Sequence, residues 1–132
     1  MENKDYTVEI LEIIRSNTSP GIMRSRLEDY HANDLAEVFP QLKVSERRKI
    51  CRILDLDMLS DIFEHIDEQE AAEYLDEMDI KKAAAILSAM ETDAVVDVLQ
   101  MIPKEKKNLL IELMDDDARK DMAIIASFDE EE

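Results

Sequence analysis

A twelve-residue period runs through residues 31–126 and constrains the fold more than any other feature of the sequence. The stretch divides without insertion into eight blocks, which read HANDLAEVFPQL, KVSERRKICRIL, DLDMLSDIFEHI, DEQEAAEYLDEM, DIKKAAAILSAM, ETDAVVDVLQMI, PKEKKNLLIELM and DDDARKDMAIIA. The eighth, ninth and twelfth places are apolar in every block, and the fifth place is apolar in five of the eight. The third place is polar in all eight blocks.

This pattern predicts one short amphipathic helix and one turn per block. Places 5, 8, 9 and 12 follow the spacing i, i+3, i+4 and i+7, which puts them on one face of an α-helix, whereas a strand would need strict alternation. Helices this short are only marginally stable alone in water, so they must bury their apolar faces against one another. We therefore expect an all-α fold, a superhelical array (solenoid) of about ten short helices, whose structural unit is an αα-hairpin of two blocks.

The chain is expected to form one domain over residues 1–132. Residues 1–30 carry two leading helices, which are separated by the Pro- and Gly-containing sequence SNTSPG at residues 16–21. Residues 31–126 carry the eight helical repeats, and residues 127–132 form an acidic exit from the domain.

The two leading helices lack the period of the blocks, so their limits are predicted from local signals. The first is expected to run from a cap at Asp5 to about Asn17 and to bury Val8, Leu11 and Ile14. The second is expected to end near Tyr30.

Turn and cap residues mark the block boundaries. An aspartate opens four of the blocks, where its carboxylate can accept hydrogen bonds from the free amides at a helix start; these residues are Asp55, Asp67, Asp79 and Asp115. Pro40 falls late in the first block, so we expect that helix to end or kink there.

The charge balance favours cationic rather than anionic partners. The chain has 33 acidic and 16 basic residues and a net charge of −17. Nucleic acids and anionic lipids are bound through basic surfaces, so neither is an expected partner, and without an apolar run near 18 residues no insertion of this segment into a membrane is expected. The single cysteine excludes an internal disulfide.

No constellation of residues predicts an enzyme. The serines lack a glycine elbow and a suitably spaced histidine and acid. Cys51 falls on the apolar face of its block, which favours a small buried side chain over a nucleophile. His31 and His65 lie far apart in sequence and lack the HExxH or CxxC spacings of zinc sites.

Pairs of aspartates recur at the third and seventh places of a block, one helical turn apart. The pairs are Asp57 with Asp61, Asp93 with Asp97, and Asp117 with Asp121. Like charges at this spacing destabilise a helix by a few tenths of a kcal/mol. One interpretation is a solvated acidic face; the other is binding of a hard cation, since Mg²⁺ prefers one or two carboxylates and retains several waters.

Basic residues cluster in two blocks and allow two interpretations. They are Arg47, Arg48, Lys49 and Arg52 in the second block and Lys104, Lys106 and Lys107 in the seventh. We expect them to pair with neighbouring acidic helices of the chain; docking of an acidic partner is the alternative.

Several stretches resemble a known family. The run RSRLEDYHANDLAEVFPQL, from Arg24 to Leu42, is similar to the opening of the N-terminal domain of MgtE-type magnesium transporters, which typically carry an H-P-A-D-L-A-E stretch. Ala32 stands in place of the proline and Asn33 in place of the alanine. The repeat DEQEAAEYLDEM also fits, and the closing SFDEEE resembles the exit of this domain toward a pair of CBS domains.

The resemblance implies a right-handed superhelix on the cytoplasmic side of the cell membrane. The parent chain would continue through the CBS domains, absent from this sequence, to a dimeric transmembrane channel. The implied partners are thus the CBS domains of the same polypeptide and a second copy of the parent transporter. The domain would sense Mg²⁺ and regulate the pore, because Mg²⁺ would bridge its carboxylates to a CBS domain and lock a closed state.

Carried over position by position, the acidic contacts of the family fall on Asp61, Asp93 and Asp97. Binding of Mg²⁺ by the isolated domain is expected to be weak, because the domain supplies only part of the ligands. The alternative is a metal-independent α-solenoid interaction module of the flagellar motor-switch type, whose helical repeats look broadly similar.

Overall fold

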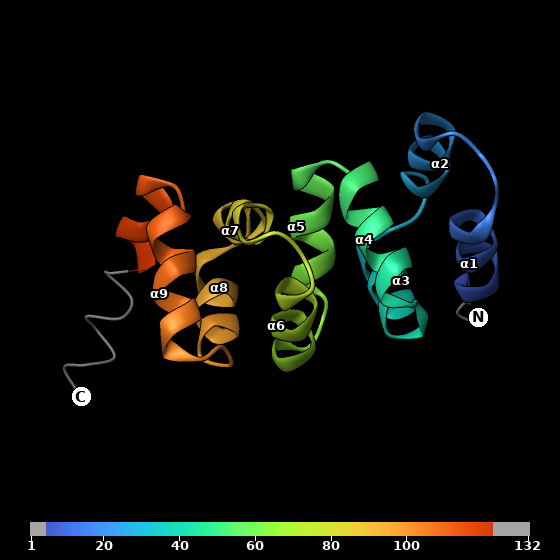
Figure 1. Cartoon of the computed structure of the whole chain (residues 1–132). Helices are drawn as coiled ribbons and strands as arrows, with labels where there is room; N and C mark the ends of the chain where they lie inside the picture. The colour runs from blue at the N-terminus through green and yellow to red at the C-terminus, as the bar shows by residue number, and fades with distance from the viewer. Residues whose placement is uncertain (1–4, 123–132) are drawn as a thin grey trace. The chain divides into compact units, whose positions relative to one another are not determined.

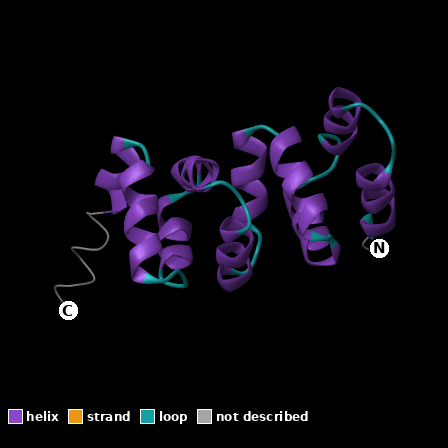
Figure 2. Cartoon of the chain, in the orientation of Figure 1, coloured by secondary structure: helices purple, strands orange, loops and turns teal. Residues whose placement is uncertain are grey.

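The computed structural model describes residues 5–122, and this part of the chain is helical and contains no strand (Figure 2). The elements in order are α1 (Thr7–Arg15), α2 (Pro20–Leu27), α3 (Ala32–Val38), the 3-10 helix η1 (Phe39–Gln41), α4 (Val44–Ile53), α5 (Leu56–Glu64), α6 (Glu68–Asp76), α7 (Ile80–Ala89), α8 (Thr92–Leu99) and α9 (Lys104–Leu113). Residues 116–122 are helical as well. The predicted all-α fold is therefore confirmed over the described residues, which contain two α-helices before residue 31 and a helix in each block.

The last four residues of the eighth block and the predicted acidic exit at residues 127–132 lie outside the described residues.

The chain divides into two compact units, residues 1–66 and 67–132, and each is described by itself. In the first unit α1 packs against α3, α3 against α5 and α2 against α4 (Figure 1). In the second unit α6 packs against α8 and α7 against α9. Within each unit, helices that are two apart along the chain thus contact each other, which is the spacing expected of a two-block structural unit.

Aromatic pairs in the first unit follow the same spacing. Phe39 and Phe63, the ninth residues of the first and third blocks, pack edge to face with ring centroids 5.8 Å apart. Tyr6 and Tyr30 form a second edge-to-face pair at 5.4 Å. Such pairs contribute about 0.5–1.5 kcal/mol beyond the area they bury.

Within the eight blocks, most of the positions that the period predicts to be apolar lie in the core. The residues at the eighth place are buried in every block; they are Val38, Ile50, Ile62, Tyr74, Ile86, Val98, Leu110 and Met122. The described ninth-place residues are buried as well, except for the half-buried Ile111, and every third-place residue is exposed. Cys51 is among the buried ninth-place residues, as predicted.

Capping and helix ends follow the local sequence signals. The carboxylates of Asp55, Asp67 and Asp79 accept hydrogen bonds from amides in the first turns of α5, α6 and α7, at 2.9, 3.2 and 3.1 Å respectively. Pro40 lies in η1, directly after the end of α3, so the predicted interruption at this proline is confirmed.

The buried face of α1 was predicted wrongly in part. Ile10 and Ile14 are buried, whereas Val8 is 66% exposed and Leu11 is half-buried. The face that α1 turns inward is set by its contacts with α2, α3 and α4, which the sequence of one helix does not specify. The second helix also ends earlier than expected, at Leu27, and Tyr30 reaches Tyr6 from the turn that follows.

The buried positions predict a contrast between two leucines of the second unit. Leu87 is fully buried and Leu109 is 52% exposed. Leu87→Ala should lower the free energy of unfolding by about 2–5 kcal/mol, because it leaves a cavity in the core. Leu109→Ala should change it by less than about 0.5 kcal/mol. Urea unfolding followed by circular dichroism measures both, and equal losses would contradict the assignment of the core.

Candidate metal-binding carboxylates

Asp93 and Asp97 lie one turn apart on α8 at exposed positions, whereas Val95 and Val98 of the same helix are buried. Asp93 is in the first turn, where the amide end of the helix stabilises negative charge. Within residues 5–122, neither carboxylate forms a hydrogen bond or an ion pair. Both therefore retain their oxygen lone pairs for a cation or for water.

Asp61 lies on α5, one turn after Asp57, and both are exposed. The main-chain oxygen of Asp61 lies 2.8 Å from Nδ1 of His65, while no described residue bonds its carboxylate. Asp61 belongs to the first unit, and Asp93 and Asp97 belong to the second. Among the described residues no group of three or more acidic, histidine or cysteine side chains is arranged to hold a metal ion.

Other carboxylates of the chain are neutralised by basic side chains of the same unit. Glu46 of α4 lies 2.9 Å from Nε of Arg15, and Asp55 lies 3.3 Å from Nη2 of Arg24. Asp76 pairs with Lys106. The structure thus separates carboxylates that stabilise the fold from the carboxylates of Asp61, Asp93 and Asp97.

The carboxylates of Glu46 and Asp55 have lowered pKa values. The hydrogen bond from Arg15, followed by the one from the main-chain N–H of Lys43, holds the pKa of Glu46 below its ordinary value. The pKa of Asp55 is lowered first by the main-chain N–H of Met58 and then by Arg24. Both groups therefore stabilise the fold in their charged form.

The basic clusters are used within the chain in two ways. Lys106 pairs with an acidic residue on α6, as expected. Nη1 of Arg47 instead donates to the main-chain oxygens of Phe39 and Leu42, at 3.2 and 2.5 Å. Nζ of Lys49 donates to the main-chain oxygen of Ile14 at 3.2 Å. The sequence did not reveal these carbonyl acceptors, because they come within reach of Arg47 and Lys49 only once α1, η1 and α4 have packed.

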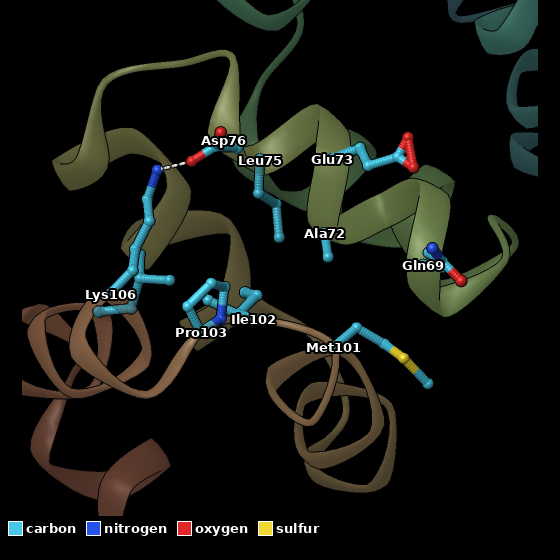
Figure 3. A pocket seen from close by; sticks show the side chains of 10 residues that line it. Gln69, Ala72, Glu73, Leu75, Asp76, Met101, Ile102, Pro103 and Lys106 are labelled. Atoms are coloured by element: carbon cyan, nitrogen blue, oxygen red, sulfur yellow. Dashed lines mark hydrogen bonds and ion pairs between the residues drawn. The ribbon is translucent and has the colours of Figure 1, made fainter.

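A pocket of about 220 Å³ lies in the second unit between α6 and the start of α9 (Figure 3). Its lining is largely apolar and includes Ala72, Leu75, Ile102 and Pro103, and the Lys106–Asp76 ion pair lies at one side. The lining residues include no serine, cysteine or histidine that could act as a nucleophile. The pocket is therefore suited to binding an apolar side chain. Sequence reasoning missed it because its residues come from three separate blocks.

The fold and these side chains define a class: an acidic, all-α helical-repeat domain that exposes unneutralised carboxylates. The family described as the MgtE intracellular N domain matches residues 30–131. The chain belongs to this family, which is a family of transporter domains and not of enzymes. The family membership that the sequence resemblance implied is therefore confirmed.

Two solved structures are similar to the chain. The soluble part of a magnesium transporter has 26% sequence identity and a TM-score of 0.80, over 89% of this chain and 46% of that one. The cytosolic domain of the Mg²⁺ channel MgtE in complex with ATP has 25% identity and a TM-score of 0.75, over 89% of this chain and 48% of that one. The chain thus spans about half the length of these relatives. No curated protein sequence matches it.

None of the helices within residues 5–122 has the length and apolar character that crossing a membrane requires.

The Arg15–Glu46 pair predicts a pH-dependent stability. Glu46 is 17% exposed, so Glu46→Gln should lower the free energy of unfolding at pH 7 by about 0.5–1 kcal/mol after allowance for solvent screening. Because folding lowers the pKa of Glu46 below its ordinary 4.5, this contribution is complete above pH 4.5 and is lost as the pH falls through the folded-state pKa. Urea unfolding of both proteins between pH 7 and pH 3 measures the difference.

The matched control for this pair is Glu37→Gln, a substitution of an exposed residue on α3 without a described partner. It should change the free energy of unfolding by less than about 0.5 kcal/mol. A difference between wild type and Glu46→Gln that stays constant down to pH 3 would contradict the role of the ion pair.

Proposed function

We propose that this chain is a cytosolic Mg²⁺-sensing regulatory domain of a magnesium transporter or channel. The observation that carries the proposal is the exposed pair Asp93 and Asp97, which no described basic residue neutralises, in a domain that belongs to the MgtE family. Two relatives with solved structures are the soluble part of a magnesium transporter and the cytosolic domain of a Mg²⁺ channel.

The donor set suits Mg²⁺ in its chemistry. Mg²⁺ takes oxygen ligands, is bound through one or two carboxylates and keeps several of its waters. Asp93 and Asp97 offer two carboxylates one turn apart on an exposed helix face, and Asp61 offers a third on the other unit. In the proposal Mg²⁺ binds at Asp61 in the first unit and at Asp93 and Asp97 in the second, in each case together with acidic groups of a second surface.

The second surface is proposed to belong to a CBS domain of the same polypeptide. With a net charge of −17, the chain repels another acidic surface at close range. Bound Mg²⁺ supplies the positive charge that offsets this repulsion. When Mg²⁺ is scarce, Asp61, Asp93 and Asp97 repel the facing carboxylates and the domain separates from its partner, which opens the pore.

This proposal places the domain on the cytoplasmic side of the cell membrane, in a parent transporter that assembles as a homodimer. The isolated chain should bind Mg²⁺ weakly, since it lacks the carboxylates of the second surface.

A metal-independent interaction module, similar to the flagellar motor-switch type, is the second candidate. The apolar pocket between α6 and α9 favours it, because such a pocket can accept a side chain of a partner (Figure 3). This second candidate function predicts that Mg²⁺ changes neither the stability nor the binding properties of the protein.

The site assignment predicts a selective loss of Mg²⁺ affinity. In the parent protein that extends through the CBS pair, Asp93→Asn with Asp97→Asn should weaken Mg²⁺ binding at least about ten-fold, because two of the carboxylate ligands lose their charge. Calorimetric titration measures the affinity. Asp117→Asn with Asp121→Asn is the matched control, since these exposed aspartates have the same spacing but are not assigned to the site. Equal effects of the two double variants, or a parent gene without CBS domains, would count against the proposal.

A thermal melt of the chain itself separates the two candidate functions. At a Mg²⁺ concentration ten times the dissociation constant, binding to the folded state should add roughly 1.4 kcal/mol to the free energy of unfolding. The melting temperature should rise relative to NaCl at matched ionic strength, and Asp93→Asn with Asp97→Asn should remove much of the rise. A melt that does not respond to Mg²⁺ up to about 50 mM would favour the interaction module.

A further inference from the structure

A pocket in the first unit is lined by basic residues, in contrast to the strongly acidic chain around it. It has a volume of about 500 Å³, and its lining residues come from α2 and α4. These two helices, labelled in Figure 1, pack against each other. The lining consists of Pro20, Gly21, Arg24, Lys49, Arg52 and Ile53. Three of these six residues are cationic and none is acidic.

The acidic groups of the same unit neutralise only part of this positive charge. Arg24 pairs with Asp55 at 3.3 Å and with Glu28 at 3.7 Å. Lys49 donates to the main-chain oxygen of Ile14, which fixes its ammonium group without cancelling its charge. Arg52 is exposed and forms no hydrogen bond or ion pair with another described residue. Lys49 and Arg52 therefore leave the pocket with uncompensated positive charge.

We propose that this pocket binds the phosphoryl groups of a small phosphate-bearing anion. A guanidinium group matches the geometry of phosphate oxygens with two parallel donors, and an ammonium group adds a point charge. A phosphate monoester carries about −1.5 to −2 charges at neutral pH, so it requires more than one cation, and Lys49 and Arg52 supply two. Its volume lies in the range of small-molecule sites.

The rest of the lining favours binding of the phosphoryl groups over binding of an organic part of the ligand. No aromatic side chain lines the pocket, so a nucleobase would find no stacking surface. Apart from its chain neighbours and the backbone of its own helix, Gly21 has no heavy atom within 4 Å of the position that a Cβ would occupy, so an anion can approach the main chain there. This inference concerns the first unit and an anion, and it does not depend on the proposed Mg²⁺ function.

The test is a titration of the 132-residue chain with pyrophosphate, in EDTA and without Mg²⁺, followed by amide chemical shifts. The amides of Gly21 and of the residues around Arg24 and Arg52 should shift saturably. Arg52→Gln should weaken binding about ten-fold, because a charge-assisted hydrogen bond is lost. Lys81→Gln is the matched control, since it removes an equal charge from an exposed site on α7, and it should change the affinity less than about two-fold.

Gly21→Ala provides a second variant that should leave the fold intact, because the added methyl group meets no atom beyond its chain neighbours and its own helix backbone. It should weaken pyrophosphate binding several-fold by obstructing the approach to the main chain. Tripolyphosphate and ATP should bind with affinities similar to each other, because the pocket recognises the phosphoryl groups and not the nucleobase.

Three results would overturn the inference. The first is the absence of saturable shifts up to about 10 mM pyrophosphate, and the second is equal weakening by Arg52→Gln and Lys81→Gln. The third is displacement of pyrophosphate by a glutamate-rich peptide at an equal concentration of charged groups, which would assign the pocket to an acidic protein segment.

Discussion

Short helices require neighbours, and this requirement governs the architecture of the chain. Each described α-helix has only seven to ten residues, too few for stability alone in water. Burial of the eighth- and ninth-place side chains against other helices of the same unit provides the missing stabilisation. The Phe39–Phe63 pair shows the principle directly, since both rings come from the same place in blocks that are two apart. Glycine and β-structure are not needed in such an array.

The same period distributes the carboxylates according to their use. An aspartate at the first place, such as Asp55, lies at a helix start and bonds to free amides there. An aspartate at the third or seventh place, such as Asp93 or Asp97, points away from the buried places and bonds to no described residue. A strongly acidic repeat protein can therefore use some carboxylates for stability and leave others for a cation. Proximity to a helix start and to a basic side chain decides which use a carboxylate has.

The positive charge is distributed less regularly than the negative charge. Arg47 and Lys49 bond to main-chain oxygens, and Lys106 pairs with Asp76 beside the apolar pocket of the second unit. In each case the acceptor lies outside the helix that carries the basic residue, within the same unit. The basic residues thus secure contacts between elements, and around α2 and α4 they also produce the cationic pocket.

The order of the helices, the buried places, the interruption at Pro40 and the exposed aspartate pairs were predictable from the sequence, because each depends on periodicity or on a residue's own backbone chemistry. The tertiary structure decided what depends on neighbours. Val8 is exposed and Ile10 is buried because of the helices that contact α1. The acceptors of Arg47 and Lys49, and both pockets, likewise exist only where separate elements meet. A repeat specifies which face of a helix is apolar, but only packing specifies which atoms come to lie opposite it.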